Sequence, residues 1–225
     1  MSIIHEERPS DSPFIETVTR GWTASDGSAI RPAENHWHMV FVKVNDRALP
    51  LVVGALTASG VASWGQGAEI LWIKFKLGTY LPHLPTKILL DQETLLPEAA
   101  GKSFWMKGSA WEFPDFENAD TFVDRLAREE TLVCDPVVDA ALQDRLPAMS
   151  PRTVRDRFLR TIGLTQSHVR QMQRAQHAAV LLRQRVSILD TVHAAGYFDQ
   201  PHLTRSLKRF IGYTPAQIIA SSQPK

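Results

Sequence analysis

Residues 194–215, AAGYFDQPHLTRSLKRFIGYTP, constrain the fold of this chain more tightly than any other segment. Gly196 is suited to end one helix, because glycine readily adopts the left-handed conformation found just beyond helix C-termini. Asp199 is a favoured N-cap residue, and Pro201 is tolerated in a helix only within the first turn. The segment therefore predicts two helices joined by a short turn, the second one covering residues 200–211.

The predicted helix 200–211 has one apolar face and one basic face. Its apolar residues are spaced four and three apart and must pack against a core: Leu203, Leu207 and Phe210. The residues that point the other way are mostly basic: Pro201, His202, Arg205, Lys208 and Arg209. A solvated basic face is the alternative interpretation. The cap, the glycine turn and the position of the proline all favour a helix-turn-helix unit instead.

In a helix-turn-helix unit the N-terminal residues of the second helix contact base edges in the major groove. Arginine is the commonest specific reader of guanine, and exposed lysine and arginine side chains suit phosphates. We therefore predict base contacts from Gln200, His202 and Arg205. We predict phosphate contacts from Thr204, Lys208 and Arg209.

An earlier segment, residues 150–163 (SPRTVRDRFLRTIG), repeats this design. Ser150 is the expected N-cap, Pro151 takes the first helical position, and Gly163 ends the helix. The outward face is mixed in charge, with Arg152, Arg155, Asp156 and Leu159. We expect Arg157 to contact phosphate. A long helix with a stripe at Val169, Met172, Ala175, Ala179 and Leu182 is predicted to join the two units.

The N-terminal part shows short apolar runs separated by glycine and proline, a pattern typical of strands. The predicted strands are HMVFVKV, LPLVVGAL, EILWIKFKL, TKILL and SFWMKGSAWEF, between residues 36 and 113. We expect a compact barrel or sandwich, followed by an amphipathic helix that starts near Asp115. Its apolar face is Ala119, Phe122, Val123 and Leu126.

Charge divides the chain into two parts. Residues 1–130 carry 12 Lys and Arg against 18 Asp and Glu, a net charge of −6, whereas residues 131–225 carry 13 Lys and Arg against 6 Asp, a net charge of +7. Such a division suggests a basic module for a polyanion joined to a second module. The predicted fold class is α+β, with a β-rich domain over residues 1–130 and an all-α domain with two helix-turn-helix units over residues 131–225.

Few residues suggest catalysis or metal binding. His36 and His38 would share one face of a strand and are weak candidates for metal ligands, but no third or fourth ligand is evident nearby. We therefore predict no metal and no cofactor, and a metal sensor built on these two histidines is the alternative. The single cysteine, Cys134, excludes a disulfide framework, and with no secretory signal or apolar span it indicates a cytoplasmic protein without membrane contact. The six tryptophans could form core or line a small-molecule pocket.

The segment from about 150 to 219 resembles the AraC family of bacterial transcription regulators. The resemblance is carried by SPRTVRDRFLRTIGLT, by RAQHAAVLL and above all by GYFDQPHLTRSLKRFIGYTPAQI. It implies a C-terminal domain with two helix-turn-helix units joined by a long helix. It also implies base reading by Arg152 and Arg155 in the first unit and by Gln200, His202 and Arg205 in the second. In the family, the preceding β-rich domains sense a small molecule or dimerise.

The expected function is therefore sequence-specific DNA binding in transcription regulation. The expected partners are double-stranded DNA, an unidentified small-molecule effector, a second copy of the chain and RNA polymerase. No enzyme is expected. In the family this module is sometimes fused to a DNA-repair methyl acceptor, which needs a zinc-held cysteine cluster, and the single Cys134 cannot form one. The alternative is a protein-interaction module that retains the fold without binding an operator.

Overall fold

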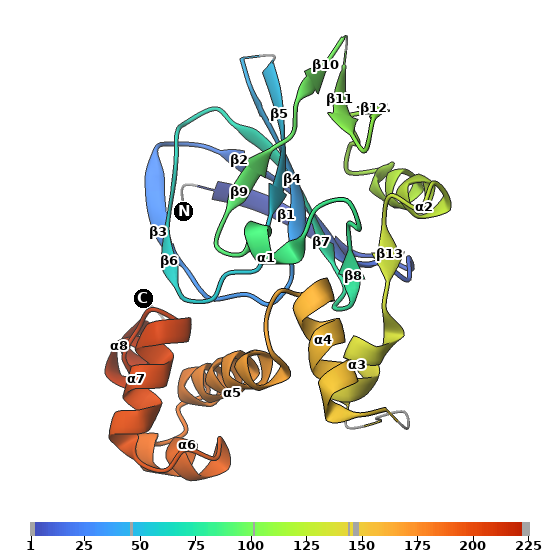
Figure 1. The fold of residues 1–225 in the computed structure, drawn as a ribbon. Helices are drawn as coiled ribbons and strands as arrows, with labels where there is room; N and C mark the ends of the chain where they lie inside the picture. The colour runs from blue at the N-terminus through green and yellow to red at the C-terminus, as the bar shows by residue number, and fades with distance from the viewer. Residues whose placement is uncertain (1–2, 46, 101, 144, 146–148, 222–225) are drawn as a thin grey trace. The chain divides into compact units, whose positions relative to one another are not determined.

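The structure is a computed structural model, and it describes residues 3–45, 47–100, 102–143, 145 and 149–221. Its residues form two compact units. The first comprises residues up to 27, 36–55 and 63–165, and the second comprises residues 28–35, 56–62 and 166–225. The two units do not coincide with the two predicted domains, residues 1–130 and 131–225. The predicted domain boundary stays a prediction. A β-rich region, residues 3–134, precedes an all-helical C-terminal region (Figure 1).

The first unit is built on a six-stranded antiparallel sheet. Its strands follow the order β1 (Ile3–Pro9), β2 (Ile15–Thr23), β7 (Glu69–Phe75), β4 (His38–Val44), β5 (Arg47–Val53) and β9 (Glu93–Leu95). The sheet is open, with β1 and β9 at its edges, so of the two architectures expected from the sequence, barrel or sandwich, it does not form a closed barrel. The smaller sheets are β10 (Glu98–Ala99), β11 (Ser103–Met106) and β12 (Ser109–Glu112), and β8 (Thr79–Tyr80) with β13 (Val133–Cys134).

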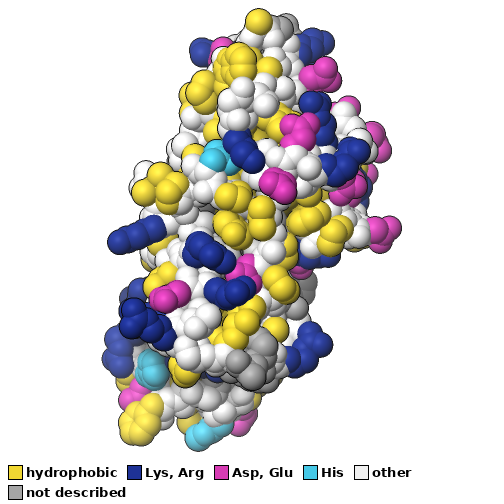
Figure 2. Space-filling view, turned by 45° about the vertical axis from the view of Figure 1, so that its right-hand side comes forward, with side chains coloured by type: hydrophobic (Ala, Val, Ile, Leu, Met, Phe, Trp, Pro, Cys, Tyr) yellow, Lys and Arg dark blue, Asp and Glu magenta, His cyan; other side chains and the backbone are white. Residues whose placement is uncertain are grey.

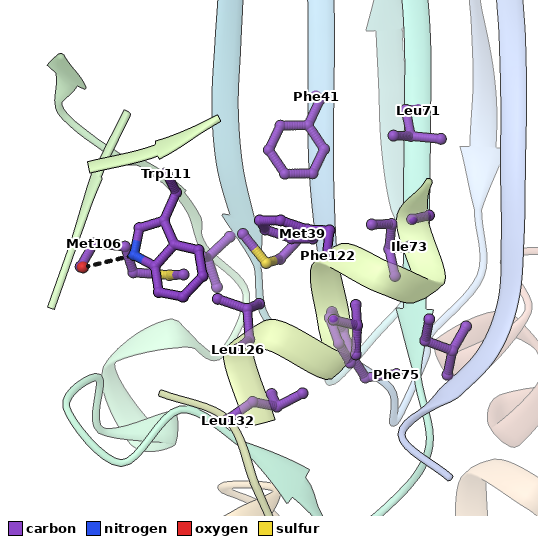
Figure 3. Close-up of a cluster of buried hydrophobic side chains, with 14 of the residues drawn as sticks. Met39, Phe41, Leu71, Ile73, Phe75, Met106, Trp111, Phe122, Leu126 and Leu132 are labelled. Atoms are coloured by element: carbon purple, nitrogen blue, oxygen red, sulfur yellow. Dashed lines mark hydrogen bonds between the residues drawn. The ribbon is translucent and has the colours of Figure 1, made fainter. Parts of the chain in front are cut away.

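The apolar core of this unit lies between the large sheet, β11, β12 and helix α2 (Ala119–Arg128) (Figure 3). Phe122 of α2 meets Phe41 of β4 edge to face, with ring centroids 6.0 Å apart. Trp111 is buried against Phe122, and its indole Nε1 donates to the Met106 carbonyl oxygen at 3.1 Å. Burial of these side chains holds the helix and the sheets together, because the removal of apolar surface from water is the main favourable term in folding.

Three sequence predictions need correction in this unit. TKILL was predicted as a strand, but Thr86–Leu89 form the short helix α1, which buries Thr86 and Leu89 and leaves Ile88 exposed. Helix α2 begins at Ala119 instead of near Asp115, because the Asp115 carboxylate accepts from the amides of Glu117 and Asn118 in a preceding turn. Strands β1 and β2 precede residue 36, outside the predicted strand region.

Helices α3 (Pro136–Leu142) and α4 (Pro151–Thr161) complete the first unit; each has a side-chain cap, and the cap of α4 is the predicted one. The Asp135 Oδ1 accepts from the Val137 amide at 3.1 Å, and the Ser150 Oγ accepts from the Thr153 amide at 3.2 Å. The apolar residues of α3 face inward: Val137, Val138 and Ala141 are buried and Leu142 is half-buried.

The second unit contains four helices and a strand pair. Its helices are α5 (Gln166–Arg183), α6 (Ile188–Ala194), α7 (Gln200–Phe210) and α8 (Pro215–Ser221), and α5 packs against the other three. The predicted stripe on α5 is buried throughout: Val169, Met172, Ala175, Ala179 and Leu182. Strands β3 (Gly27–Arg31) and β6 (Gly60–Trp64) pair with each other, and their residues 28–31 and 60–62 belong to this unit. Among the described residues, none of the helices is both long and apolar enough to cross a membrane.

Candidate nucleic-acid interface

Helix α7 begins where the sequence predicted. The Asp199 Oδ1 accepts from the His202 amide at 2.7 Å, and Gly196 has the left-handed φ of +68° that ends the preceding helix. Its buried side chains are Leu203, Leu207 and Phe210. The exposed ones are Gln200, Pro201, Arg205, Lys208 and Arg209. The helix therefore presents a polar and cationic face to solvent, as an amphipathic reading helix requires.

Tyr197 fixes the turn that leads into α7. Its ring is buried beneath the guanidinium of Arg174, which lies 4.6 Å from the ring centroid. The Tyr197 hydroxyl is 2.9 Å from the Ser206 Oγ. The His202 ring meets the Tyr197 ring edge to face, with 5.1 Å between the ring centroids. Arg174 Nη1 also donates to the Gly196 carbonyl oxygen at 3.3 Å. These contacts tie α5, the turn and α7 together, and they leave His202 half-buried while Gln200 and Arg205 are exposed.

Helix α4 offers a second, more mixed surface. Arg152, Arg155 and Asp156 are exposed, and Leu159 is half-buried. Both predicted readers therefore reach solvent from the same helix, next to a carboxylate that would repel phosphate. Helix α4 belongs to the first unit and α7 to the second.

Arg157 is half-buried and is bound by a carboxylate of the same unit. Its Nη1 donates to the buried carboxylate of Asp135 at 2.9 Å, and Arg160 Nη2 donates to the other oxygen of the same carboxylate at 3.0 Å. This geometry gives Arg157 a structural partner that sequence spacing did not indicate. Its predicted phosphate contact stays a prediction, as does the phosphate contact of the half-buried Thr204.

Phe198 is a surface residue that the sequence analysis did not single out. It lies one position before the N-cap of α7, and 92% of its surface is exposed. An apolar side chain beside the N-terminus of a reading helix can contact the methyl group of thymine. A signal was present in the sequence, since Phe198 is a large apolar residue in the short turn AGYFD, residues 195–199, that leads into α7.

The charged side chains on one face of the molecule are shown in Figure 2, where Lys and Arg are interspersed with Asp, Glu and His. The exposed positive charge of the C-terminal region is carried by more than one helix. The exposed cations of α7 are Arg205, Lys208 and Arg209, and those of α4 are Arg152, Arg155 and Arg160.

The histidine pair does not form the strand arrangement expected from the sequence. Strand β4 begins at His38, and His36 lies outside it, so the two side chains are not consecutive residues of one strand face. Among the described residues, no group of three or more His, Cys, Asp or Glu could hold a metal ion.

A cavity of about 400 Å³ lies in the first unit, at one end of strands β2, β4 and β7. Trp22, Phe41, Phe113 and Phe116 give it aromatic walls. The Arg20 guanidinium lies 5.6 Å from the Trp22 ring and 4.5 Å from the Phe116 ring, and it pairs with Glu6 at 2.6 Å. Tryptophans thus occur in both of the expected roles: Trp37 and Trp111 are core residues, and Trp22 lines the cavity.

Comparison with protein families gives a match over residues 146–221, to a model described as a helix-turn-helix domain. Residues 146–221 are an AraC-type helix-turn-helix domain. The match includes α4 and α7 together with α5, α6 and α8. The match supports DNA binding and a role in transcription regulation, and regulators that carry this domain are typically not enzymes. Neither the curated proteins nor the solved structures gave a match to the chain.

Proposed function

We propose that this protein is a sequence-specific transcriptional regulator that reads the major groove with α7. The observation that supports this most directly is the N-terminal end of α7, where an Asp199 cap and a buried Tyr197 hold a helix whose Gln200 and Arg205 are exposed. Within an AraC-type domain this is the geometry by which a second helix meets base edges. Arg205 is assigned to a guanine, and Lys208 and Arg209 to phosphates.

Helix α4 is proposed as the second reader, with Arg152 and Arg155 toward the bases. Their exposure on a capped helix supports this role, and the neighbouring Asp156 could accept a hydrogen bond from cytosine N4. Binding by both helices would engage two successive segments of the major groove. The protein would act in the cytoplasm, and a homodimer and a contact with RNA polymerase stay predictions.

The cavity beside Trp22 is the proposed site for a small-molecule effector. Its volume falls within the range of about 300–1,000 Å³ that ligand sites occupy. Its aromatic walls favour a flat, largely apolar molecule, since stacking and apolar burial supply most of the binding free energy in such sites.

The proposal is tested by selection from a random pool of double-stranded DNA with the full-length protein and with Arg205→Ala. A recovered motif spanning two successive major-groove segments supports reading by both helices. A short motif that is lost in Arg205→Ala supports reading by α7 alone. Recovery of no motif, at low salt and with or without cavity ligands, contradicts the proposal and favours the protein-interaction module.

A further inference from the structure

The last carbonyl groups of a helix have no partners within the helix and must find them elsewhere. Both candidate reading helices meet this requirement with groups from the N-terminal part of the chain. Each helix does so inside its own compact unit, α7 with residues 28–35 and 56–62, and α4 with α1.

At the end of α7, three consecutive carbonyl oxygens are bound. The Ser59 Oγ donates to the Lys208 oxygen at 3.1 Å, and the Ser59 amide donates to the Arg209 oxygen at 2.7 Å. The Ala33 amide donates to the Phe210 oxygen at 2.7 Å. Ser59 thus binds the main chain of the two residues whose side chains we assign to phosphates.

At the end of α4, the hydroxyl of Thr86 binds the carbonyl oxygens. The Thr86 Oγ1 lies within hydrogen-bond distance of two carbonyl oxygens, that of Leu159 at 3.2 Å and that of Arg160 at 2.8 Å. Thr86 is buried in α1. Its hydroxyl therefore adds a protein partner for this end of the helix, beside the Gly163 amide, which donates to the Leu159 oxygen at 3.1 Å.

A glycine follows each helix end and allows the close approach. Gly163 and Gly212 have left-handed φ values of +79° and +89°. A Cβ atom at Gly163 would lie 3.1 Å from the Leu90 Cγ, and one at Gly212 would lie 2.4 Å from the Ile30 Cγ2. The same sequence pattern, Ile-Gly followed by a residue and Thr, occurs at both ends, at residues 162–165 and 211–214.

From this correspondence we propose that Ser59 and Thr86 are positioning residues for DNA reading, Ser59 for α7 and Thr86 for α4. The inference rests on the proposed function. A hydroxyl that binds the last turn sets the direction of the helix axis, and the base-reading side chains lie at the other end of the same helix. A small rotation about the bound end therefore displaces Arg205 or Arg152 from its base.

The experiment compares Ser59→Ala and Thr86→Val in the full-length protein. Both changes remove a hydroxyl and keep nearly the same size. The matched controls are Ser63→Ala on β6 and Thr121→Val on α2, two exposed positions. Each variant is taken through DNA selection, and its affinity for the wild-type motif is measured at one fixed salt concentration.

We expect Ser59→Ala to weaken binding about three- to tenfold, the range of one net hydrogen bond. It should also relax the base preference at the positions that Arg205→Ala relaxes. Thr86→Val should relax the base preference at a different set of positions in the motif, those that Arg152→Ala relaxes. A purely structural role would lower the melting temperature without changing base preference. The two controls should behave as the wild type does.

Hydrogen exchange of the free protein provides the second measurement, because the amides of Ser59 and Ala33 must be protected if they bind the carbonyls of α7. Exchange at the rate of an open loop overturns the inference. The inference is also overturned if Ser59→Ala and Thr86→Val both keep the base preference of the wild type while Arg205→Ala changes it. If the wild-type protein selects no motif, the proposed function is contradicted. The exchange data then still test whether the Ser59 and Ala33 amides bind the carbonyl oxygens of α7.

Discussion

Asp135 and Arg157 form an ion pair in which the carboxylate is buried, with 2.9 Å between the Asp135 Oδ1 and the Arg157 Nη1. Only 3% of the Asp135 side chain is exposed, and its second oxygen accepts from Arg160 at 3.0 Å. Because Asp135 also caps the start of α3 through the Val137 amide, one carboxylate joins the beginning of α3 to the last two turns of α4. The first candidate reading helix is thus fixed from its inner side by a charged residue.

Replacement of this carboxylate should destabilise the first unit. We expect Asp135→Ala to lower the free energy of unfolding by about 1–3 kcal/mol, because it removes an N-cap and the hydrogen-bonded partner of two arginines. Urea denaturation followed by circular dichroism measures this change. Asp156→Ala, an exposed carboxylate on α4, is the control and should change stability little. Equal effects of the two substitutions would contradict the structural role of Asp135.

The cations of α7 should separate into two classes of DNA contact. Arg205→Ala should cost about 1–3 kcal/mol on the preferred site and relax the preference at one base pair. Lys208→Ala should weaken binding to all sequences alike and reduce the salt slope by about one. Binding isotherms on specific and random duplexes over a range of salt concentrations distinguish the two. An unchanged affinity and base preference in Arg205→Ala would mean that α7 is not the reading helix.

Phe198 should contribute to DNA binding without contributing to stability. Because 92% of its surface is exposed, Phe198→Ala should change the free energy of unfolding by less than about 0.5 kcal/mol. We expect it to weaken binding to the selected motif several-fold, with the greatest loss at a thymine. Val180→Ala, another exposed apolar residue of the same unit, is the control. If both variants bind as the wild type does, Phe198 makes no contact with DNA.

The stability of the first unit should depend on Asp120 at acid pH. Partial burial raises the pKa of this carboxyl group, but hydrogen bonds from Ser10 and Arg8 and the charge of Arg8 outweigh it, so the pKa is lowered overall. A carboxyl group with a lowered pKa stabilises the fold above its unfolded value, near 3.9, and loses this effect as the pH falls through the folded value.

The free energy of unfolding of the wild type should therefore approach that of Asp120→Asn as the pH falls below about 4. Urea denaturation at a series of pH values measures the difference. Arg8→Gln should reduce the same acid dependence, because it removes the charge that lowers the pKa of Asp120. A difference between wild type and Asp120→Asn that is independent of pH would show that the ion pair does not stabilise the fold.

The cavity should bind small aromatic molecules through Trp22. In a thermal-shift screen with the full-length protein, a ligand that binds only the folded state raises the melting temperature by mass action. Trp22→Ala should abolish the shift, whereas Trp105→Ala should retain it, because Trp105 is an exposed residue of β11 that does not line the cavity. Shifts that survive in Trp22→Ala would place the ligand elsewhere.

Patterns confined to a few neighbouring residues gave accurate predictions. HMVFVKV forms strand β4 over the predicted residues, and SFWMKGSAWEF forms β11 and β12 around the turn at Lys107 and Gly108, both of which have positive φ. Caps and apolar periodicity gave α4 and α7. These signals are local, since an N-cap bond joins residues three apart and a helix face repeats every three or four residues.

Segments whose state depends on distant partners were predicted less well. TKILL has the composition of a strand, but Pro85 precedes it and its residue Thr86 binds the carbonyl oxygens of α4, 73 and 74 residues away. β1 was missed because most of its residues are polar and exposed, and it is a strand because it pairs with β2 along its whole length.

The sequence by itself therefore determined the class of the fold, the start of α7 and the exposed side chains that make it a candidate DNA reader. Only the tertiary structure decided what binds the C-terminal ends of α4 and α7, which carboxylate holds Arg157, and where the aromatic residues enclose a cavity. The reason is physical. A helix start is satisfied by its own cap residue, whereas its last carbonyl groups accept from whatever donor the rest of the fold brings to them.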